Sequence, residues 1–327
     1  MAKNIIFCAD GTWNTKDEKD HGIVSPTNVN KLYNLLINDA RQLTYYDNGL
    51  GARQTEFVKI FEGMTGIGLV EKILDGYQFL MQNWQEGDAI FLFGFSRGAY
   101  TVRYLADMMA HFGLLKPLPD ESLLEQRQRV HEAYLSYREK RNASSGAEAE
   151  YCKITMVGVW DTVGDLGIPL HILSPLNHAL FGFHDEILHP SVLYGYQALA
   201  IDELRELYKP SLWENRSGVT QVWFIGSHSD VGGGYADHGL ADITLAWMIG
   251  KAITHGVLFH AELVNQLGNP YGILHKPWEE LEFLLFFRLH REIPLRADIH
   301  HTVELRMAKK ELAYLPTNLP STYTFVD

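Results

Sequence analysis

The first third of the chain alternates between short apolar runs and longer amphipathic stretches, and this pattern is the strongest constraint on its fold. Apolar residues at helical spacing mark the amphipathic stretches as helices, and the apolar runs are typical of buried strands. Such an alternation indicates a parallel sheet whose strands are joined by right-handed helical crossovers. We predict an α/β fold with a mostly parallel sheet and helices on both faces. The predicted strands are 4–9, 42–47 and 89–95, and the predicted helices are 27–39, 68–84 and 97–113.

The rest of the chain continues this pattern less regularly. Further strands are predicted at 153–161 and 219–226 and a further helix at 241–256. The segments between them are either charged and helix-forming, which suggests an inserted helical hairpin, or apolar and poorly periodic. Long unpatterned apolar segments are uncommon in a compact domain unless they cover a site. We therefore predict one domain, residues 1–327, with cap insertions at about 114–150, 165–195 and 257–295.

Composition narrows the class of protein. A chain of 327 residues that is 46% hydrophobic can bury a substantial core. Its formal charge of −12 disfavours a nucleic-acid partner, which needs clustered Lys and Arg for the phosphates. No apolar run approaches the roughly 20 residues that span a bilayer, and the first residues resemble a strand rather than a signal peptide. We expect a soluble protein made in the cytoplasm.

The two cysteines, Cys8 and Cys152, both lie in apolar runs. Small buried thiols are the simplest interpretation, because neither cysteine has a partner at disulfide-motif or metal-ligand spacing. We expect no metal site and no cofactor.

Polar turns begin at Asp10, Ser96, Asp161 and His228, each at or directly after the end of a predicted strand. In an open parallel sheet, ligands and catalytic groups lie at the carboxyl ends of the strands. These four turns should therefore meet at one edge of the sheet.

Ser96 lies between two glycines, Gly94 and Gly98, with an apolar strand before it and an amphipathic helix after it. This context is typical of a nucleophile elbow, a sharp strand-to-helix turn in which small neighbours leave room for the backbone. A structural glycine turn is the alternative. We predict that Ser96 is the nucleophile of an α/β-hydrolase-like fold.

A serine nucleophile needs a histidine base, which in turn needs a carboxylate to orient it. The order Ser96, Asp161, His228 is the order found in α/β-hydrolases. Asp161 ends an apolar strand, and His228 follows one and precedes a glycine-rich loop. We predict that these three residues form the catalytic triad. The competing acids are Asp165, Asp202 and Asp230, and the histidines on predicted helices or in the polar tail are His111, His131, His255, His260, His300 and His301.

An acyl-transfer site also needs donors for the oxyanion. In this fold one donor is the backbone amide after the nucleophile, here Arg97, and the other comes from the loop after the first strand, here Gly11 or Thr12. An Asx turn at Asp10 is an alternative explanation of that loop.

Six motifs in order resemble one family: CADGTWN (8–14), GFSRGA (94–99), GVWDTVG (158–164), AIDELR (200–205), HSDVGGGY (228–235) and GLADITLAWMI (239–249). The chain resembles the α/β-hydrolase family that includes the catalytic domains of type VI secretion phospholipase effectors and many uncharacterised bacterial and fungal proteins. This resemblance implies a Ser–Asp–His hydrolase that acts on phospholipid or other lipid esters, and secretion by a type VI-like route without a signal peptide.

We therefore predict a carboxylic ester hydrolase that works through an acyl-enzyme. Its expected partner is a small-molecule or lipid ester, with transient contact with a membrane surface. Two alternatives stay open. The first is a metal-dependent phosphatase, because CADGT is similar to the Asp-loop of those enzymes, although Cys8 stands where they have their nucleophilic aspartate. The second is a non-catalytic binding module with the same fold. The loop at 228–235 could also bind an anion, but it lacks Lys, which favours a conformational role.

Overall fold

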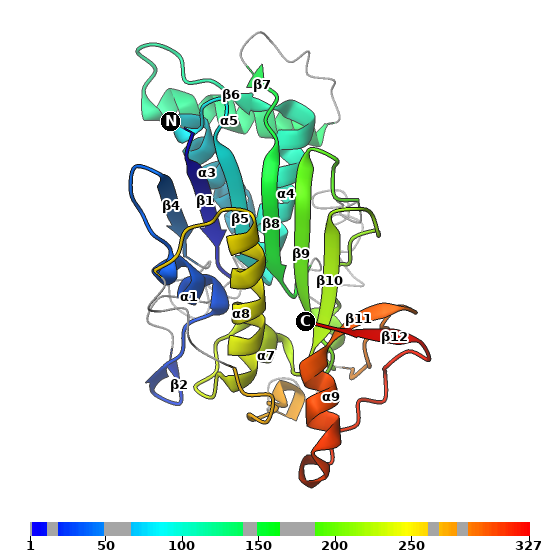
Figure 1. The fold of residues 1–327 in the computed structure, drawn as a ribbon. Helices are drawn as coiled ribbons and strands as arrows, with labels where there is room; N and C mark the ends of the chain where they lie inside the picture. Colours follow the sequence, from blue (N-terminus) through cyan, green and yellow to red (C-terminus); the bar gives the residue numbers. More distant parts are fainter. Residues whose placement is uncertain are drawn as a thin grey trace.

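The protein is built around one parallel sheet of eight strands (Figure 1). The computed structural model describes residues 2–11, 19–48, 67–139, 149–163, 187–260, 268–279 and 287–327. All neighbouring strands of this sheet run parallel. From one edge to the other they are β12 (Tyr323–Val326), β11 (Ala297–His300), β10 (Val219–Phe224), β9 (Val192–Ala200), β8 (Ile154–Trp160), β5 (Ala89–Phe95), β1 (Asn4–Ala9) and β4 (Gln42–Asp47). The predicted α/β fold class with a mostly parallel sheet is confirmed.

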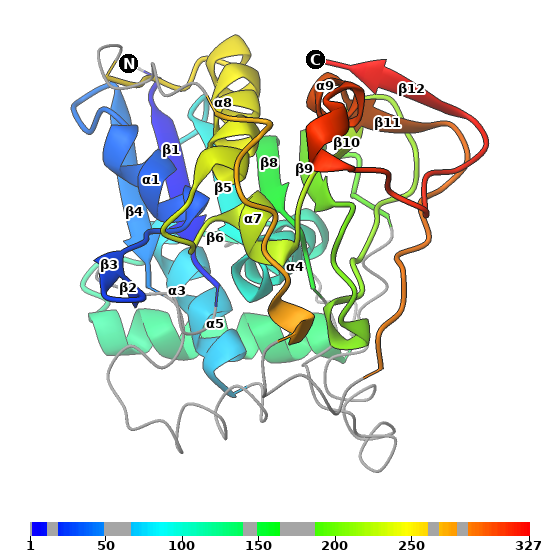
Figure 2. The ribbon, with the colours of Figure 1, turned by 90° about the horizontal axis from the view of Figure 1, so that it is seen from below.

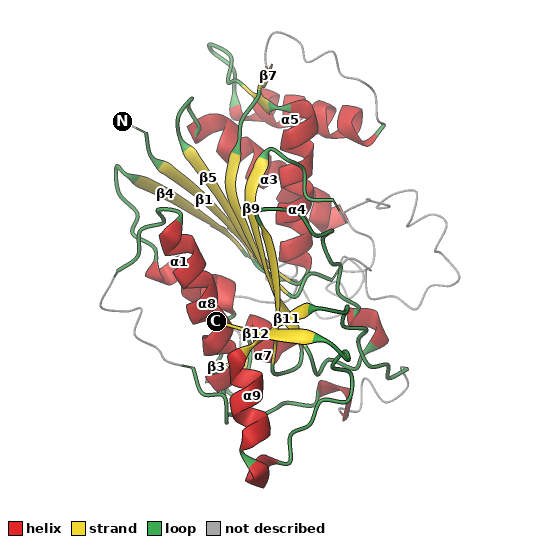
Figure 3. Cartoon of the chain, turned by 45° about the vertical axis from the view of Figure 1, so that its right-hand side comes forward, coloured by secondary structure: helices red, strands yellow, loops and turns green. Residues whose placement is uncertain are grey.

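Helices cover both faces of the sheet, as the apolar strands predicted (Figures 1 and 3). One face carries α1 (Asn28–Leu35) and α8 (Gly239–Thr254), and the other carries α3 (Ile67–Asn83) and α4 (Arg97–Phe112). Alternate residues of β1 point to opposite faces: Phe7 joins the core under α3 and α4, whereas Cys8 joins the core under α1 and α8. Thr27 caps α1 by accepting a hydrogen bond from the Asn30 amide at 3.1 Å.

The two cysteines are free and buried, as predicted. Burial raises the pKa of both thiols, that of Cys152 to about 12. Neither thiol is therefore a reactive nucleophile near neutral pH.

The sheet contains strands that the apolar pattern did not predict. The predicted insertion at 165–195 was wrong at its end, because residues 192–195 belong to β9, a central strand. Gly195 and the buried polar Gln197 interrupt the apolar run there, so the segment lacks a clear strand pattern. The predicted polar tail likewise forms β11, α9 (His301–Ala308) and β12.

The predicted insertion at 114–150 has one long helix, α5 (Leu123–Arg138), which packs against α3 and α4. The short strands β6 (Leu114–Leu115) and β7 (Ala149–Glu150) pair antiparallel beside it, and residues 140–148 lie outside the described part of the chain. Figures 1 and 3 show α5 at the opposite end of the sheet from the short helix α7 (His228–Gly232). The described part of this insertion therefore does not cover the carboxyl ends of the strands.

The carboxyl ends of the strands lie at the end that α7 occupies, which faces the viewer in Figure 2. β1 lies between β4 and β5, so the chain leaves β1 toward one edge and returns on its other side. This reversal is the topological switch point at which open α/β sheets bind ligands. Short elements complete the fold: β2 (Lys19–Asp20), β3 (Ile23–Val24), η1 (Glu206–Tyr208), η3 (Pro277–Glu279) and η5 (Lys310–Leu312).

Within the described ranges, we find no helix that combines the length and apolar character needed to cross a bilayer.

Candidate active site

Ser96 joins β5 to α4 at a strained turn. Its backbone has φ 56° and ψ −121°, a conformation that a residue with a side chain seldom adopts. Strain of this kind costs about 1–3 kcal/mol and persists where the surrounding fold imposes it. The Ser96 amide donates to the Trp160 carbonyl at 3.1 Å, which ties the turn to the end of β8. This is the geometry expected of a nucleophile elbow.

The glycines on either side of Ser96 are required by close backbone contacts. A Cβ at Gly94 would lie 2.4 Å from the Gly98 carbonyl oxygen, and one at Gly98 would lie 2.1 Å from the Ala9 carbonyl oxygen. Both contacts are with backbone atoms, which cannot move aside as a flexible side chain can. The start of α4 is thus pressed against the end of β1, which brings the two predicted oxyanion loops together.

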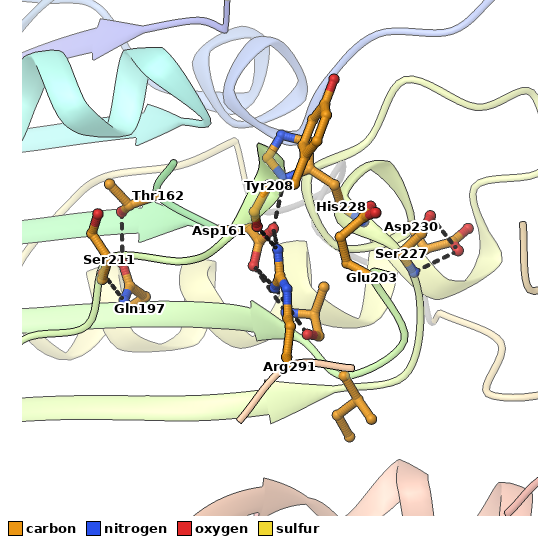
Figure 4. Close-up of polar contacts among 12 residues, drawn as sticks. Asp161, Thr162, Gln197, Glu203, Tyr208, Ser211, Ser227, His228, Asp230 and Arg291 are labelled. Atoms are coloured by element: carbon orange, nitrogen blue, oxygen red, sulfur yellow. Dashed lines mark hydrogen bonds and ion pairs between the residues drawn. The ribbon is translucent and has the colours of Figure 1, made fainter. Parts of the chain in front are cut away.

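His228 and Asp161 form a buried pair at the same edge of the sheet (Figure 4). His228 Nδ1 lies 2.6 Å from Asp161 Oδ2. The aspartate is fixed by β9, because its amide donates to the Ala198 carbonyl and its Oδ1 accepts from the Ala200 amide at 3.0 Å. The Phe95 ring lies 4.6 Å from the imidazole, between centroids. The residue next to Ser96 therefore packs directly on His228.

Charged neighbours set the protonation of this pair. Burial alone would raise the pKa of Asp161, but the charge of Arg291 and the hydrogen bonds from His228 and Arg291 outweigh it and hold that pKa well below its usual range. Burial lowers the pKa of His228, against the opposing effect of Asp161. The resting pair is thus a neutral imidazole beside an ionised carboxylate, the form in which histidine acts as a base.

Two further charged residues at the pair, Arg291 and Glu203, were not predicted from the sequence. Arg291 contacts both oxygens of Asp161, at 2.6 and 2.8 Å, and Glu203 accepts a hydrogen bond from the His228 amide at 3.1 Å. Glu203 is itself held by a bidentate pair with Arg205, with both distances 2.8 Å. Glu203 and Arg205 lie in the motif at 200–205, which was a signal for both. For Arg291 the only signal was the presence of a charged residue in a poorly periodic apolar segment.

The segments that carry the predicted oxyanion donors, residues 10–12 and 96–97, are only partly described. The Gly11 amide donates to Asp10 Oδ1 at 2.7 Å, whereas the alternative Asx turn would bond the amide two residues on. Asp10 Oδ2 also accepts from the Thr27 and Tyr46 hydroxyls, both at 2.6 Å. Burial raises the pKa of Asp10. The predicted donor Thr12 lies outside the described residues, and Arg97 is the first residue of α4, where burial lowers the pKa of its guanidinium to about 10.

The competing acids have other partners. Asp230 accepts from the Ser227 amide at 2.9 Å and lies 2.6 Å from His275 Nδ1. Asp202 accepts from the Gly226 amide and the Tyr314 hydroxyl. Asp165 lies outside the described residues. Of the described candidates, Asp161 is thus the one that contacts His228.

The competing histidines lie elsewhere: His111 is on α4, His131 on α5, and His255 follows α8. The first part of the predicted glycine-rich loop, residues 228–232, forms the helix α7 instead, and α7 is tied to the start of α1, where the Asn28 side-chain amide donates to the Val231 carbonyl at 2.9 Å. This contact favours the conformational role predicted for that loop.

The parallel sheet, the strained Ser96 turn and the His228–Asp161 pair at one edge define the class of α/β-hydrolase-like proteins. The family model for the type VI secretion system phospholipase effector Tle1-like catalytic domain matches residues 3–251. The chain belongs to this family, as its motifs predicted. The family is named for phospholipases, which are hydrolases of lipid esters.

The individual proteins that the chain resembles share about a third or less of its residues over the aligned parts. The chain is 32% identical over 199 residues to the uncharacterized protein YEL023C of Saccharomyces cerevisiae, an alignment that spans 53% of this chain and 28% of the yeast protein. An uncharacterized protein from Pseudomonas aeruginosa is similar in structure, with a TM-score of 0.49 and 17% identity over 86% of this chain and 48% of that one. The Tle1 effector, solved bound to the VgrG spike of the type 6 secretion system, has a TM-score of 0.45 and 19% identity over 72% of this chain and 52% of that one.

Proposed function

We propose that the protein is a serine hydrolase that cleaves carboxylic esters, with lipid or phospholipid acyl esters as its substrates. The observation that carries this proposal is the buried His228–Asp161 pair at 2.6 Å, packed against the residue next to a serine in a strained strand-to-helix turn. We also propose that residues 1–327 form one domain, because strands from both ends of the described chain share one sheet.

The proposed chemistry follows from these positions. His228 Nε2 takes the proton of the Ser96 hydroxyl while the serine oxygen attacks the ester carbonyl carbon. The tetrahedral intermediate then breaks its bond to the alcohol oxygen, which receives that proton from His228 and leaves an acyl-enzyme. Water, deprotonated by the same imidazole, releases the acid and restores Ser96. The Arg97 amide is the better supported oxyanion donor, because the Gly11 amide already donates to Asp10.

A fluorophosphonate probe tests this proposal directly. We expect the native protein to be labelled once, on Ser96, because the probe reacts with serines activated by a base. Peptide mass mapping identifies the labelled residue, and heat-denatured protein is the control that should not react. Ester turnover by a protein that the probe leaves unlabelled would contradict the proposal.

A lipid substrate is supported by apolar side chains exposed near the site. Phe287 is 80% exposed and Leu289 is 62% exposed on the segment that leads to Arg291. This segment lies against the start of η1: the Leu289 amide donates to the carbonyl of Leu204, just before η1, at 2.8 Å, and the Glu206 amide donates to the Phe287 carbonyl at 3.3 Å. Exposed apolar groups around a site are suited to contact with a lipid surface. The other predicted acyl-binding segment, 166–188, lies mostly outside the described residues.

The replacement Phe287→Asp should slow hydrolysis of phosphatidylcholine vesicles by about tenfold, since burying a phenylalanine contributes roughly 1.5–3 kcal/mol. The rate of hydrolysis of a short-chain p-nitrophenyl ester should stay within about twofold of the wild type, because this soluble substrate reaches the site without contact between the protein and a lipid surface. The matched control is Leu124→Asp. Leu124 is 79% exposed and lies on α5, at the other end of the sheet. Equal effects of both replacements on vesicles would argue against this contact.

The structure gives less support to the two alternatives. Cys8, in the place of a phosphatase nucleophile, is fully buried in β1, and Asp10 is occupied by three hydrogen bonds. A non-catalytic module has no need for an ionised aspartate held beside a buried histidine. We also propose secretion by a type VI-like route, and the support for it is the family description alone.

A further inference from the structure

Arg291 reaches the candidate site from a part of the chain that the family model does not match. It lies 40 residues beyond the matched range 3–251 and is only 7% exposed (Figure 4). Nη1 donates to Asp161 Oδ1 at 2.6 Å and to the Ala200 carbonyl at 2.9 Å. Nη2 donates to Asp161 Oδ2 at 2.8 Å and to the Tyr208 carbonyl at 2.6 Å. The guanidinium thus joins Asp161 to two backbone segments.

These contacts complete the hydrogen bonding of the Asp161 carboxylate. Oδ1 accepts from Arg291 and from the Ala200 amide, and Oδ2 accepts from Arg291 and lies 2.6 Å from His228 Nδ1. Two partners at each oxygen fill the roughly four lone-pair sites that a carboxylate offers. The carboxylate is therefore fixed in position and in plane, and it can direct only one bond to the imidazole.

We propose that Arg291 is a positioning residue of the triad, which holds Asp161 ionised and oriented so that His228 presents Nε2 as a base. This inference rests on the proposed hydrolase function. A buried bidentate arginine–carboxylate pair is strong and geometrically specific, so it can hold a charge that burial would otherwise neutralise.

The surrounding charges make the effect of Arg291 on pH dependence predictable. Among the described residues, the groups that face the His228–Asp161 pair are Arg291, the Glu203–Arg205 ion pair, and the Tyr208 ring, which packs edge-on to His228 at 4.9 Å. In the resting site the two carboxylates balance the two arginines. Removing Arg291 leaves Asp161 buried without its countercharge, which favours a proton on Asp161 or on His228. Both changes remove the active base. The acid limb, the part of the pH–activity profile in which activity rises with pH, therefore moves to higher pH.

The segment that carries Arg291 has other anchors. The Leu289 amide donates to the Leu204 carbonyl, the Glu206 amide donates to the Phe287 carbonyl, and the Asn318 side chain donates to the Arg291 carbonyl. These bonds are independent of the guanidinium. Replacement of the side chain can therefore test its charge and geometry while the segment stays attached.

The experiment compares Arg291→Met and Arg291→Lys with the wild type over pH 5–9. The readouts are kcat and KM for a soluble short-chain ester and the rate of fluorophosphonate labelling. For Arg291→Met we expect kcat to fall about 100-fold, because a displaced catalytic group can cost that much, with little change in KM. Its acid limb should move up by about one pH unit or more, the effect expected of a lost adjacent charge.

Arg291→Lys keeps the charge and loses the bidentate geometry, so its acid limb should stay near that of the wild type while kcat stays reduced. Arg288→Met is the matched control: Arg288 lies on the same segment and is exposed, and its guanidinium donates to the Trp278 carbonyl. It should change neither kcat nor the acid limb.

The outcomes separate this inference from the proposed function. A wild type that the probe does not label at Ser96 overturns the proposed function itself. A labelled wild type whose Arg291→Met variant keeps the wild-type acid limb overturns the inference, even if kcat falls, because a purely structural role reduces activity without moving the profile. If Arg291→Met does not fold, the neutral variant Arg291→Gln takes its place under the same criterion: an acid limb that stays at the wild-type pH overturns the inference, and one that moves to higher pH supports it.

Discussion

Replacing Ser96 with alanine should reduce ester hydrolysis by about 10⁴- to 10⁶-fold, the loss found when a triad nucleophile is removed. The hydroxyl is the only group of the proposed site that forms a covalent bond to the substrate, so no neighbour can replace it. The residual rate should come from the oxyanion donors and substrate binding. Hydrolysis of a short-chain ester, followed by stopped assays over long times, measures both rates.

The same replacement should leave the free energy of unfolding within about 1 kcal/mol of the wild type, because alanine keeps the Cβ and thus the same strain at φ 56°. The matched control is Ser122→Ala. Ser122 caps α5 at the far end of the sheet, so its loss should cost about 1 kcal/mol of stability and no activity. A Ser96→Ala variant that hydrolyses esters within tenfold of the wild-type rate would exclude Ser96 as the nucleophile.

The strands that carry Ser96, Asp161 and His228 could be predicted because each is an apolar run that ends at a polar residue. The parallel fold then required their ends to share an edge, so chain order was enough to propose that they meet. β9 was missed because Gly195 and Gln197 break its pattern, and the four-residue strands β11 and β12 are too short for a pattern to show. Their place in the sheet depends on pairing with neighbours, which local sequence does not encode.

The charges that tune the candidate site were harder to predict than its central residues. Arg291 and Asp161 are 130 residues apart, and no local rule links an arginine in an irregular segment to a strand end that distant. Glu203 is equally hidden, because its part is to accept a backbone amide and to pair with its neighbour Arg205. Such groups become visible only when the fold brings them into contact. The family-matched part of the chain thus supplies the proposed triad, and a segment outside it supplies the countercharge.

Replacing Asp161 with asparagine should lower kcat by about 10⁴-fold, because the amide would favour the wrong tautomer of His228. Asparagine can accept from Arg291 or from the Ala200 amide, but its NH₂ group would face an imidazole nitrogen that should donate. The KM for a short-chain ester should change little, since Asp161 is fully buried and bonds to His228 Nδ1, on the ring nitrogen opposite the one proposed to act on the substrate. Measuring kcat and KM separately distinguishes this loss from weakened binding.

The same replacement should also destabilise the protein by about 3 kcal/mol at pH 7.5, because it leaves the Arg291 charge buried without its carboxylate. The loss should grow at pH 5. The pKa of His228 is already lowered in the folded protein, so stability falls as the pH drops below the unfolded value of about 6.5, and loss of Asp161 lowers that pKa further.

The matched control for both effects is Asp202→Asn, because Asp202 is a half-buried aspartate that follows the end of β9. Burial raises its pKa to about 6, so folding disfavours its ionised form relative to the unfolded chain, and a neutral side chain should cost little stability and little activity. Urea unfolding at pH 7.5 and pH 5, together with kinetics at pH 7.5, compares the two variants. If Asp161→Asn and Asp202→Asn behave alike in both measurements, Asp161 has no special role as the partner of His228.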